Sequence, residues 1–232
     1  MLNSTIEIKI KQRLNKLDSQ DYDNIECWQI VEAFNKAQVE WARRQLHGIN
    51  ITKEGDEGST RRKDDLQILL NNMDLSLTDK DIYYASKLPV DYLQWKRLDV
   101  YAKQECCDKR RMTVYFAEEE NVNLLLRDKA KQPNFVWAET FATLIGGYVN
   151  IYSNNVFEIQ SADIIYYRQP IKIQIQGCVD PYTSLESTQN IQCEFKDDVV
   201  ELIIDEAVSI LAGDIESGSQ FSRGTETAER NN

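Results

Sequence analysis

Hydrophobic residues recur at helical spacing in two segments near the start of the chain. In residues 5–17 the apolar positions lie three or four residues apart. A longer and stronger pattern runs over residues 22–46, and Gly48 lies where a helix-ending glycine is common. The apolar positions of this longer pattern are Ile25, Trp28, Val31, Phe34, Ala37 and Trp41. We therefore predict that residues 1–49 form a helical hairpin.

The second predicted helix carries two tryptophans, Trp28 and Trp41, on its apolar face. Two such side chains bury a large area and need a partner surface. One interpretation is core packing against the first helix and a sheet. The other is contact with a neighbouring subunit, and the two interpretations are compatible.

Residues 50–80 interrupt the hydrophobic pattern. The first part, residues 50–60, is polar and contains glycines, so we predict an exposed loop followed by a short helix. Arg61, Arg62 and Lys63 form a small basic cluster. Such a cluster is usually solvated surface, but in an assembly it could meet an acidic partner.

A β-rich texture follows over residues 81–180, where β-branched and aromatic residues alternate with polar ones. One helix, residues 118–129, is expected to interrupt the strands, and Cys106–Lys109 is expected to form a hairpin turn. The predicted strands are Ile82–Leu88, Leu93–Glu105, Arg110–Ala117, Phe135–Thr143, Tyr148–Tyr152, Val156–Gln160, Ile164–Arg168 and Ile171–Gln176.

The last predicted element is a helix within residues 181–216. After a loop, Asp197 or Asp198 can cap a helix that runs to about Ala212, and its apolar face is expected to pack beside the long tryptophan-bearing helix. Residues 217–232 lack apolar periodicity and are predicted to be a flexible tail. The predicted class is α+β: an N-terminal helical hairpin, a central mainly antiparallel β-sheet with one helix, and a C-terminal helix.

Composition narrows the classes of partner. The net charge of -11 argues against wrapping nucleic acid by phosphate neutralisation, although an acidic wall would let a DNA duplex slide past. No apolar run approaches the roughly 20 residues that cross a bilayer, so no membrane partner is predicted. The first residues lack a secretory pattern, which predicts a protein that matures in a cytoplasm. The odd number and wide scatter of the cysteines favour reduced thiols over a disulfide framework.

Candidate chemistry is sparse in this sequence. The only histidine, His47, has no partners in the spacing of a catalytic triad or a zinc helix, and no phosphate-binding glycine loop occurs. Acidic residues cluster at 118–120 and at Asp205-Glu206. We interpret both clusters as helix-surface acids, with a metal-dependent nuclease as the less favoured alternative. The prediction is a non-enzyme with no cofactor and no metal.

Several sequence blocks, which together cover most of residues 15–212, carry a resemblance to a known family. They are Leu17–Tyr22 leading into Trp28–Leu46, Lys87–Leu93, Asn150–Tyr152 with Tyr166–Pro170, and Phe195–Asp198. With the order of helices, sheet and helix, they resemble the connector or adaptor proteins that tailed phages place beneath the portal. The ring proteins of crAss-like phages and the adaptors of the tubular tail protein A type are the most similar.

The resemblance implies a structural virion protein at the head–tail interface. Such proteins form a homomeric ring of about twelve-fold symmetry that extends the DNA channel and joins the portal protein to the next tail or ring protein. Double-stranded DNA would pass through without specific binding. The alternative is a soluble phage binding or assembly protein that stays outside the particle.

Aromatic and arginine side chains are the natural candidates for contacts between subunits or with the portal. The candidates are Trp28, Trp41, Arg43, Arg61, Arg62, Tyr166, Tyr167, Arg168, Phe221 and Arg223. Phe221 is the one large hydrophobe of the tail, so we expect the tail to order on the portal with Phe221 as its anchor and Arg223 as a polar contact. Because the net charge opposes self-association, the isolated protein is expected to be monomeric or weakly associated.

Overall fold

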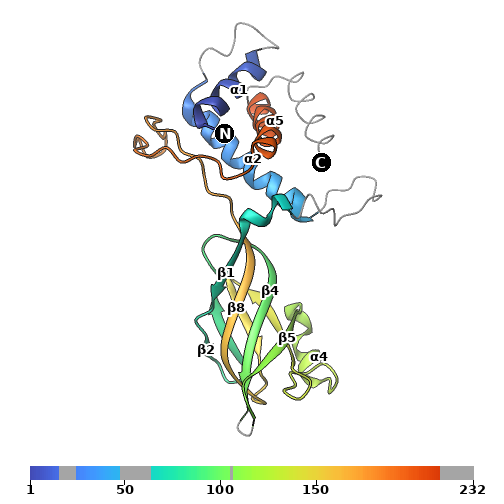
Figure 1. Cartoon of the computed structure of the whole chain (residues 1–232). Helices are drawn as coiled ribbons and strands as arrows, with labels where there is room; N and C mark the ends of the chain where they lie inside the picture. Colours follow the sequence, from blue (N-terminus) through green and yellow to red (C-terminus); the bar gives the residue numbers. More distant parts are fainter. Residues whose placement is uncertain (16–24, 48–63, 105–106, 215–232) are drawn as a thin grey trace, which may run out of the picture. The chain divides into compact units, whose positions relative to one another are not determined.

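The computed structural model describes residues 1–15, 25–47, 64–104 and 107–214 (Figure 1). The chain divides into two compact units. The helical unit combines Met1–Ile68 with Pro170–Asn232, and the sheet unit is the continuous segment Leu69–Gln169. The predicted α+β class, with helices in the first and last parts of the chain and a mainly antiparallel sheet between them, is confirmed. The expectations for the loop at 50–60, the basic cluster at 61–63 and the tail at 217–232 lie outside the described residues.

The helical unit is built on α1 (Asn3–Asn15), α2 (Cys27–His47) and α5 (Asp197–Asp214). Figure 1 shows α5 beside α2, which is the packing expected from their apolar faces. The ring of Trp41 on α2 meets the ring of Phe195 edge to face, with 5.1 Å between their centroids. The largest fully buried side chains of this core include Ile6, Ile10, Leu14, Ile30, Phe34 and Ile173.

Ion pairs line the seams where α5 meets the other helices. Arg13 on α1 binds Glu201, and its guanidinium also reaches Asp205 at 2.7 Å. Arg44 on α2 donates to both carboxylate oxygens of Glu206, at 2.6 and 2.5 Å. Burial raises the pKa of Glu206, and the Arg44 guanidinium opposes this rise. Glu206 is buried, so removing Arg44 would leave a buried charge without its partner.

The sheet unit is a curled eight-stranded sheet with the order β1-β8-β4-β5-β6-β7-β3-β2. Its neighbouring strands are antiparallel except β5 and β6, which pair in parallel. The strands are β1 (Leu70–Asp74), β2 (Thr78–Asp79), β3 (Tyr83–Lys87), β4 (Tyr92–Lys103), β5 (Arg110–Phe116), β6 (Glu139–Ile145), β7 (Tyr148–Tyr152) and β8 (Glu158–Arg168). One face of the sheet encloses a core whose fully buried members include Val100, Val149, Ile151 and Ile164.

The other face of β6 and β7 is also covered. A short 3-10 helix, η2 (Glu119–Asn121), leads into α4 (Val122–Arg127), and Val122 packs in a small cluster with Phe141 and Tyr152. The rings of Phe141 and Tyr152 stack with 4.6 Å between their centroids. Because both faces are covered, β6 and β7 are buried at consecutive positions and show no alternation.

Several predicted elements differ from those observed. The helix expected at 118–129 is shorter, because its first turn is the 3-10 helix η2 and α4 ends at Arg127. The strand expected at 135–143 begins only at Glu139, since the residues before it form a turn. The two strands expected at 156–160 and 164–168 are one strand, β8, because Ala162 between them is buried and keeps the alternation going.

The edges of the sheet were not predicted. β1 and β2 come from the segment 64–80, where a loop and a short helix were expected; a short 3-10 helix, η1 (Gln67–Leu69), does form directly before β1. No strand forms at 171–176, and only an isolated bridge joins Gln174 to Ile191. The sheet unit therefore begins at Leu69 and ends at Gln169, and residues 170–180 belong to the helical unit.

Candidate functional site

A long irregular segment of the helical unit, residues 170–196, follows β8 and precedes α5 in the sequence. We call it the arm. It folds back on itself through isolated antiparallel bridges, which pair Gln174 with Ile191 and Val179 with Glu186. Because the arm has no regular strand partner, its backbone groups need other hydrogen-bonding partners.

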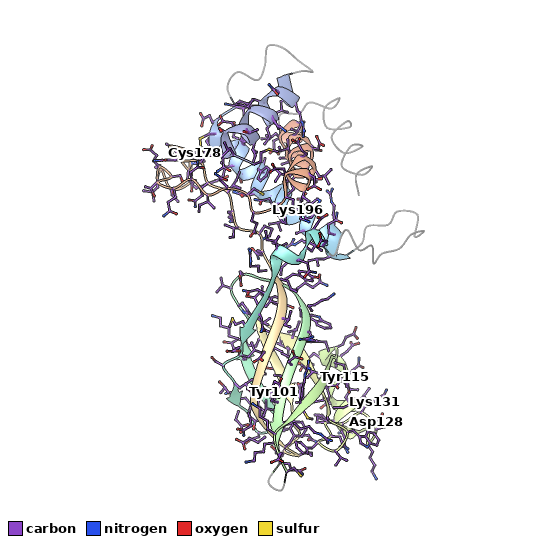
Figure 2. The ribbon with its side chains drawn as sticks, in the orientation of Figure 1. Tyr101, Tyr115, Asp128, Lys131, Cys178 and Lys196 are labelled. Atoms are coloured by element: carbon purple, nitrogen blue, oxygen red, sulfur yellow. A yellow bond between two sulfur atoms is a disulfide. The ribbon has the colours of Figure 1, made fainter. Side chains whose placement is uncertain are left out.

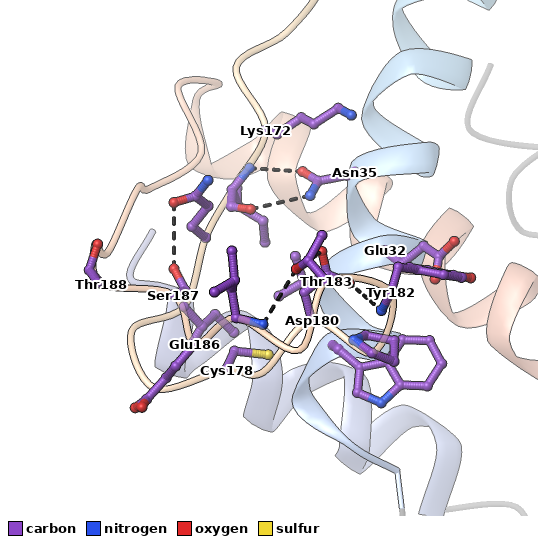
Figure 3. A pocket seen from close by; sticks show the side chains of 17 residues that line it. Glu32, Asn35, Lys172, Cys178, Asp180, Tyr182, Thr183, Glu186, Ser187 and Thr188 are labelled. Atoms are coloured by element: carbon purple, nitrogen blue, oxygen red, sulfur yellow. Dashed lines mark hydrogen bonds between the residues drawn. The ribbon is translucent and has the colours of Figure 1, made fainter.

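Side-chain amides of α2 provide some of the hydrogen-bonding partners that the backbone of the arm lacks. Asn35 donates its Nδ2 to the carbonyl oxygen of Ile173 at 3.2 Å and accepts the backbone N–H of Ile173 at 2.8 Å (Figure 3). Gln38 donates to the Oδ1 atom of Asn35 at 2.9 Å and so holds this amide in orientation. The Asn35 side chain thus takes the place of a neighbouring strand, which explains why the apolar alternation at 171–176 gives no strand.

Asn3, the first residue of α1, attaches the arm at a second level. Its buried Nδ2 lies 2.8 Å from the carbonyl oxygens of Gln174 and of Ile191, and 2.7 Å from the Oδ1 atom of Asn190. These acceptors come from both limbs of the arm. Asn3 therefore joins the two limbs to each other and to the helix.

A disulfide between Cys27 and Cys178 forms a third attachment, with 5.8 Å between the Cα atoms. It joins the start of α2 to the arm, and it corrects the expectation of reduced thiols for these two cysteines, whereas Cys107 and Cys193 are thiols. The two cysteines are 151 residues apart in sequence, so spacing gave no signal for the pair. Cys193 keeps a buried thiol that donates to Gln38 at 3.4 Å, and burial raises the pKa of this thiol.

Between the arm and α2 lies a cavity of about 440 Å³, which we call the arm groove (Figure 3). Its apolar lining comes from Trp28, Val31, Ile173, Ile175, Cys178, Pro181, Tyr182 and Leu185. Glu32, Asp180 and Glu186 line it as acids, and of its described lining residues Lys172 alone carries a positive charge. The groove is therefore apolar with an acidic border.

The tip of the arm exposes apolar side chains from a fixed turn. Tyr182 and Leu185 are 80% and 70% exposed. The Asp180 carboxylate accepts the backbone N–H of Tyr182 at 2.9 Å and the hydroxyl of Thr183 at 3.0 Å (Figure 3). The backbone N–H of Asp180 in turn donates to the carbonyl oxygen of Leu185 at 3.0 Å. These bonds close the turn and hold both apolar side chains outward.

A second exposed apolar feature lies in the sheet unit, in the turn formed by residues 134–139, which we call the Trp137 turn. Asn134 accepts the backbone N–H groups of Val136 and Trp137 at 2.9 and 3.1 Å. Arg110 donates to the carbonyl oxygens of Phe135 and Val136 at 3.0 and 2.8 Å. Phe135 is buried in the core, whereas Val136 and Trp137 are 71% and 63% exposed. An anchored turn therefore presents an exposed indole ring.

The segment that leads into the Trp137 turn is basic. Arg127, Lys129 and Lys131 are all exposed. Figure 2 shows Lys131 near Tyr115 on β5, and the Tyr115 hydroxyl donates to the carbonyl oxygen of Lys131 at 2.9 Å. This contact ties the basic segment to the sheet. The segment's three positive charges outnumber its one exposed acid, Asp128, although the net charge of the whole chain is -11.

The candidate residues from sequence fall into separate places. Trp28 is half-buried and lines the arm groove, whereas Trp41 lies in the core of the helical unit. Tyr166 and Tyr167 are also buried, and the Tyr166 hydroxyl donates to Asp91 at 2.9 Å. Their burial makes these three side chains part of the core and not of an exposed surface.

Among the other candidates, Arg43 is exposed on α2 and Arg168 is partly exposed on β8. Arg61, Arg62, Phe221 and Arg223 lie outside the described residues.

Asp205 and Glu206, the acidic pair on α5 noted in the sequence, are both bound by arginines. Asp205 pairs with Arg13, and Glu206 pairs with Arg44, so neither carboxylate is presented to a substrate. Among the residues that the structure describes, no group of three or more His, Cys, Asp or Glu side chains is arranged to hold a metal ion. In the same part of the chain, no helix combines the length and the apolar character needed to cross a membrane.

No protein-family model matches the chain, and no curated protein matches its sequence.

Proposed function

We propose that this protein is a structural subunit of a tailed-phage virion, a head-to-tail connector that forms a homomeric ring beneath the portal. The ring would extend the DNA channel and join the portal protein to the next tail component. The observation that carries this proposal is the arm. It is attached to α1 and α2 by two amide contacts and a disulfide, yet it holds Tyr182 and Leu185 outward in water.

Rigid exposed apolar side chains favour an assembly role. Exposed apolar surface is stabilised when it is removed from water, and aromatic side chains fixed in advance lose little entropy on contact. A side chain such as Tyr182 is therefore typical of an interface anchor. A closed ring of identical subunits needs such a surface on every copy and a matching surface on its neighbour.

The net charge of the chain supports the proposed role of the ring as a DNA channel. A net charge of -11 repels phosphates, so a duplex could move through a ring of these subunits without binding to its wall. The resemblance to connector proteins in the blocks around Trp28–Leu46 and Tyr166–Pro170 supports the same class. The proposed partners are copies of the same chain, the portal protein and a neighbouring tail or ring protein, with the virion as the location.

Mass spectrometry of purified phage particles tests this function. We expect the chain at near-stoichiometric amounts with the portal protein, and a ring on the portal in negative-stain images of the two proteins mixed. Particles without the chain would contradict the connector function and favour an assembly protein that stays outside the virion. Hydrolysis of DNA by the purified chain with a divalent metal ion would favour the nuclease alternative.

An arm-tip variant connects this test to the structure. Changing both Tyr182 and Leu185 to Ser is expected to remove the chain from particles, because the apolar anchor is lost while the core is untouched. Val90→Ser is the matched control, since Val90 is exposed in the sheet unit and is not part of the arm. Equal incorporation of the double variant and the control would show that the arm tip is not the anchor.

A further inference from the structure

We infer that the arm groove of one copy receives the Trp137 turn of a second copy of the same chain. This inference rests on the proposed ring function, because it names the contact between neighbouring subunits. It assigns one surface of the helical unit as the receptor and one surface of the sheet unit as its ligand, always in two different molecules.

The receptor side has the form of a binding groove. A volume of about 440 Å³ lies within the range of roughly 300–1,000 Å³ that is typical of ligand pockets, so an indole ring and its neighbouring side chain fit. Trp28 and Val31 line it from α2, and Ile173, Tyr182 and Leu185 line it from the arm. The disulfide and the Asn35 contacts hold the arm against α2, so the groove exists before a partner arrives.

The ligand side is equally fixed in advance. Asn134 and Arg110 both bind the backbone of the Trp137 turn, and the buried Phe135 anchors it to the core. Val136 and Trp137 consequently point into solvent without a flexible backbone beneath them. Tryptophan is enriched among the residues that dominate binding energy at protein interfaces, and a rigid turn reduces the entropy lost on docking.

Charge complementarity selects a second copy as the occupant. Three acids, Glu32, Asp180 and Glu186, border the groove. Lys172 is the one positively charged residue among its described lining residues. The surface around the Trp137 turn is more basic, because Arg110, Arg127, Lys129 and Lys131 outnumber the exposed acids Asp128 and Glu139. Surfaces of opposite sign steer two molecules together and disfavour other orientations. The chain thus carries an apolar groove with an acidic border and an apolar projection with a basic border.

The two surfaces are different, so the contact is head-to-tail. Such a contact uses the groove of one copy and the turn of the next, and each copy keeps a vacant surface for a further neighbour. Repeated contacts of this kind close into a ring when the rotation between copies permits it, and otherwise extend into a filament. A two-fold dimer, in which both copies use the same surface, is not expected.

Photo-cross-linking between isotope-labelled copies tests the contact, and it detects association that is weak in solution. Trp137 is replaced by p-benzoylphenylalanine in the full chain, and the variant is mixed with ¹⁵N-labelled wild-type chain. We expect cross-links between unlabelled and labelled copies, on peptides from residues 172–188. The matched control carries the same cross-linker at Tyr148, another exposed aromatic of the sheet unit, and should not label these peptides.

Variants of the labelled copy then test the groove. Leu185→Asp should reduce the yield of these cross-links about tenfold or more, as the loss of a dominant anchor predicts. Glu186→Lys should reduce it by a smaller factor, and Glu158→Lys, which changes the net charge equally but lies outside the groove, should leave it unchanged. Far-UV circular dichroism checks that each variant is folded.

Cross-links within one chain only, cross-links to other segments, or no cross-links would each overturn the inference. So would an unchanged yield with Leu185→Asp. These outcomes are independent of the proposed function, because the chain could associate head-to-tail without entering a virion. Conversely, the chain could be present in particles while its subunits meet through other surfaces, in which case the particles contain the protein but the cross-links are absent.

Discussion

The helical unit and the sheet unit are joined internally by different kinds of bond. In the helical unit, contacts link segments that are far apart in sequence, such as Arg13 with Asp205 and Arg44 with Glu206, separated by 192 and 162 residues. Side chains make these links, through ion pairs, amides and a disulfide. In the sheet unit, one continuous segment is held by backbone ladders and encloses its own core.

This difference predicts different sensitivities. A ladder of backbone hydrogen bonds does not depend on any single side chain, so the sheet unit is vulnerable mainly through its core. The helical unit has to close long loops before its contacts form, and loop closure lowers the entropy of the chain. Bonds that restrict those loops, such as the disulfide between Cys27 and Cys178, therefore stabilise the helical unit, in which both cysteines lie.

The largest expected effect comes from removing one buried ring from each unit. Phe34→Ala empties a site in the helical core and Phe141→Ala does the same in the sheet unit, and each change should cost about 3–5 kcal/mol of unfolding free energy. We expect each variant to lose amide protection in its own unit, measured by hydrogen exchange resolved by residue. Loss of protection in both units with either variant would show that they unfold together.

Removing the disulfide should have the next largest effect. Cys27→Ser should lower the stability of the helical unit by roughly 2–4 kcal/mol, because the reduced chain no longer has a closed loop in its unfolded state. Exchange of the arm amides at Gly177 and Ser187 should accelerate, while the amides of β4 should not respond. Cys107→Ser, outside the disulfide, serves as control. The comparison fails if β4 loses protection as strongly as the arm.

A carboxylate in the sheet unit gives the smallest effect, and its sign depends on pH. Asp163 lies opposite Asp74 on β1 and Asp99 on β4, and burial, followed by the hydrogen bond and charge of Asp74, raises its pKa. A raised pKa means that the ionised form destabilises the fold. Stability from this group is therefore greatest below the unfolded-state pKa and falls as the pH rises toward the folded-state value.

Asp163→Asn should accordingly stabilise the sheet unit at pH 7 by a few tenths of a kcal/mol, about the size of a cross-strand charge interaction. The gain should disappear in acid, where the native carboxyl is protonated. Asp99→Asn is the matched control, because Asp99 pairs with Arg97 and Arg111, and its loss should destabilise instead. Urea unfolding at several pH values measures the free energy of unfolding of both variants. A gain for Asp163→Asn that is equal at all pH values would contradict the raised pKa of Asp163.

Periodicity was sufficient to predict the elements with one clearly buried face. The helices α1, α2 and α5 follow the spacing of their apolar residues, and β4, β5 and β7 lie within two residues of their expected bounds. β1 was missed because Asn71, Asn72 and Asp74 leave it almost entirely exposed at the edge of the sheet. Its strand character comes from pairing with β8 and not from its own sequence.

The candidate site was harder to predict than the fold. Trp28 was recognised as an aromatic that could meet a partner, but Tyr182, Leu185 and Trp137 were not. A local signal was present: Asp180-Pro181 precedes Tyr182, and Pro133-Asn134 precedes Trp137 by a few residues, so each aromatic follows turn-forming residues. The disulfide and the Asn35 contact depend on tertiary proximity, which spacing along the chain does not reveal.

The composition of the helical unit from segments far apart in sequence has a consequence for synthesis. Arg44 is synthesised 162 residues before Glu206, which at about 5–20 residues per second is a delay of roughly eight to thirty-two seconds. During that interval the sheet unit can fold, while α1 and α2 wait for α5 and the arm. The proposed receptor surface therefore matures last, and a nascent chain cannot capture a neighbour prematurely through it.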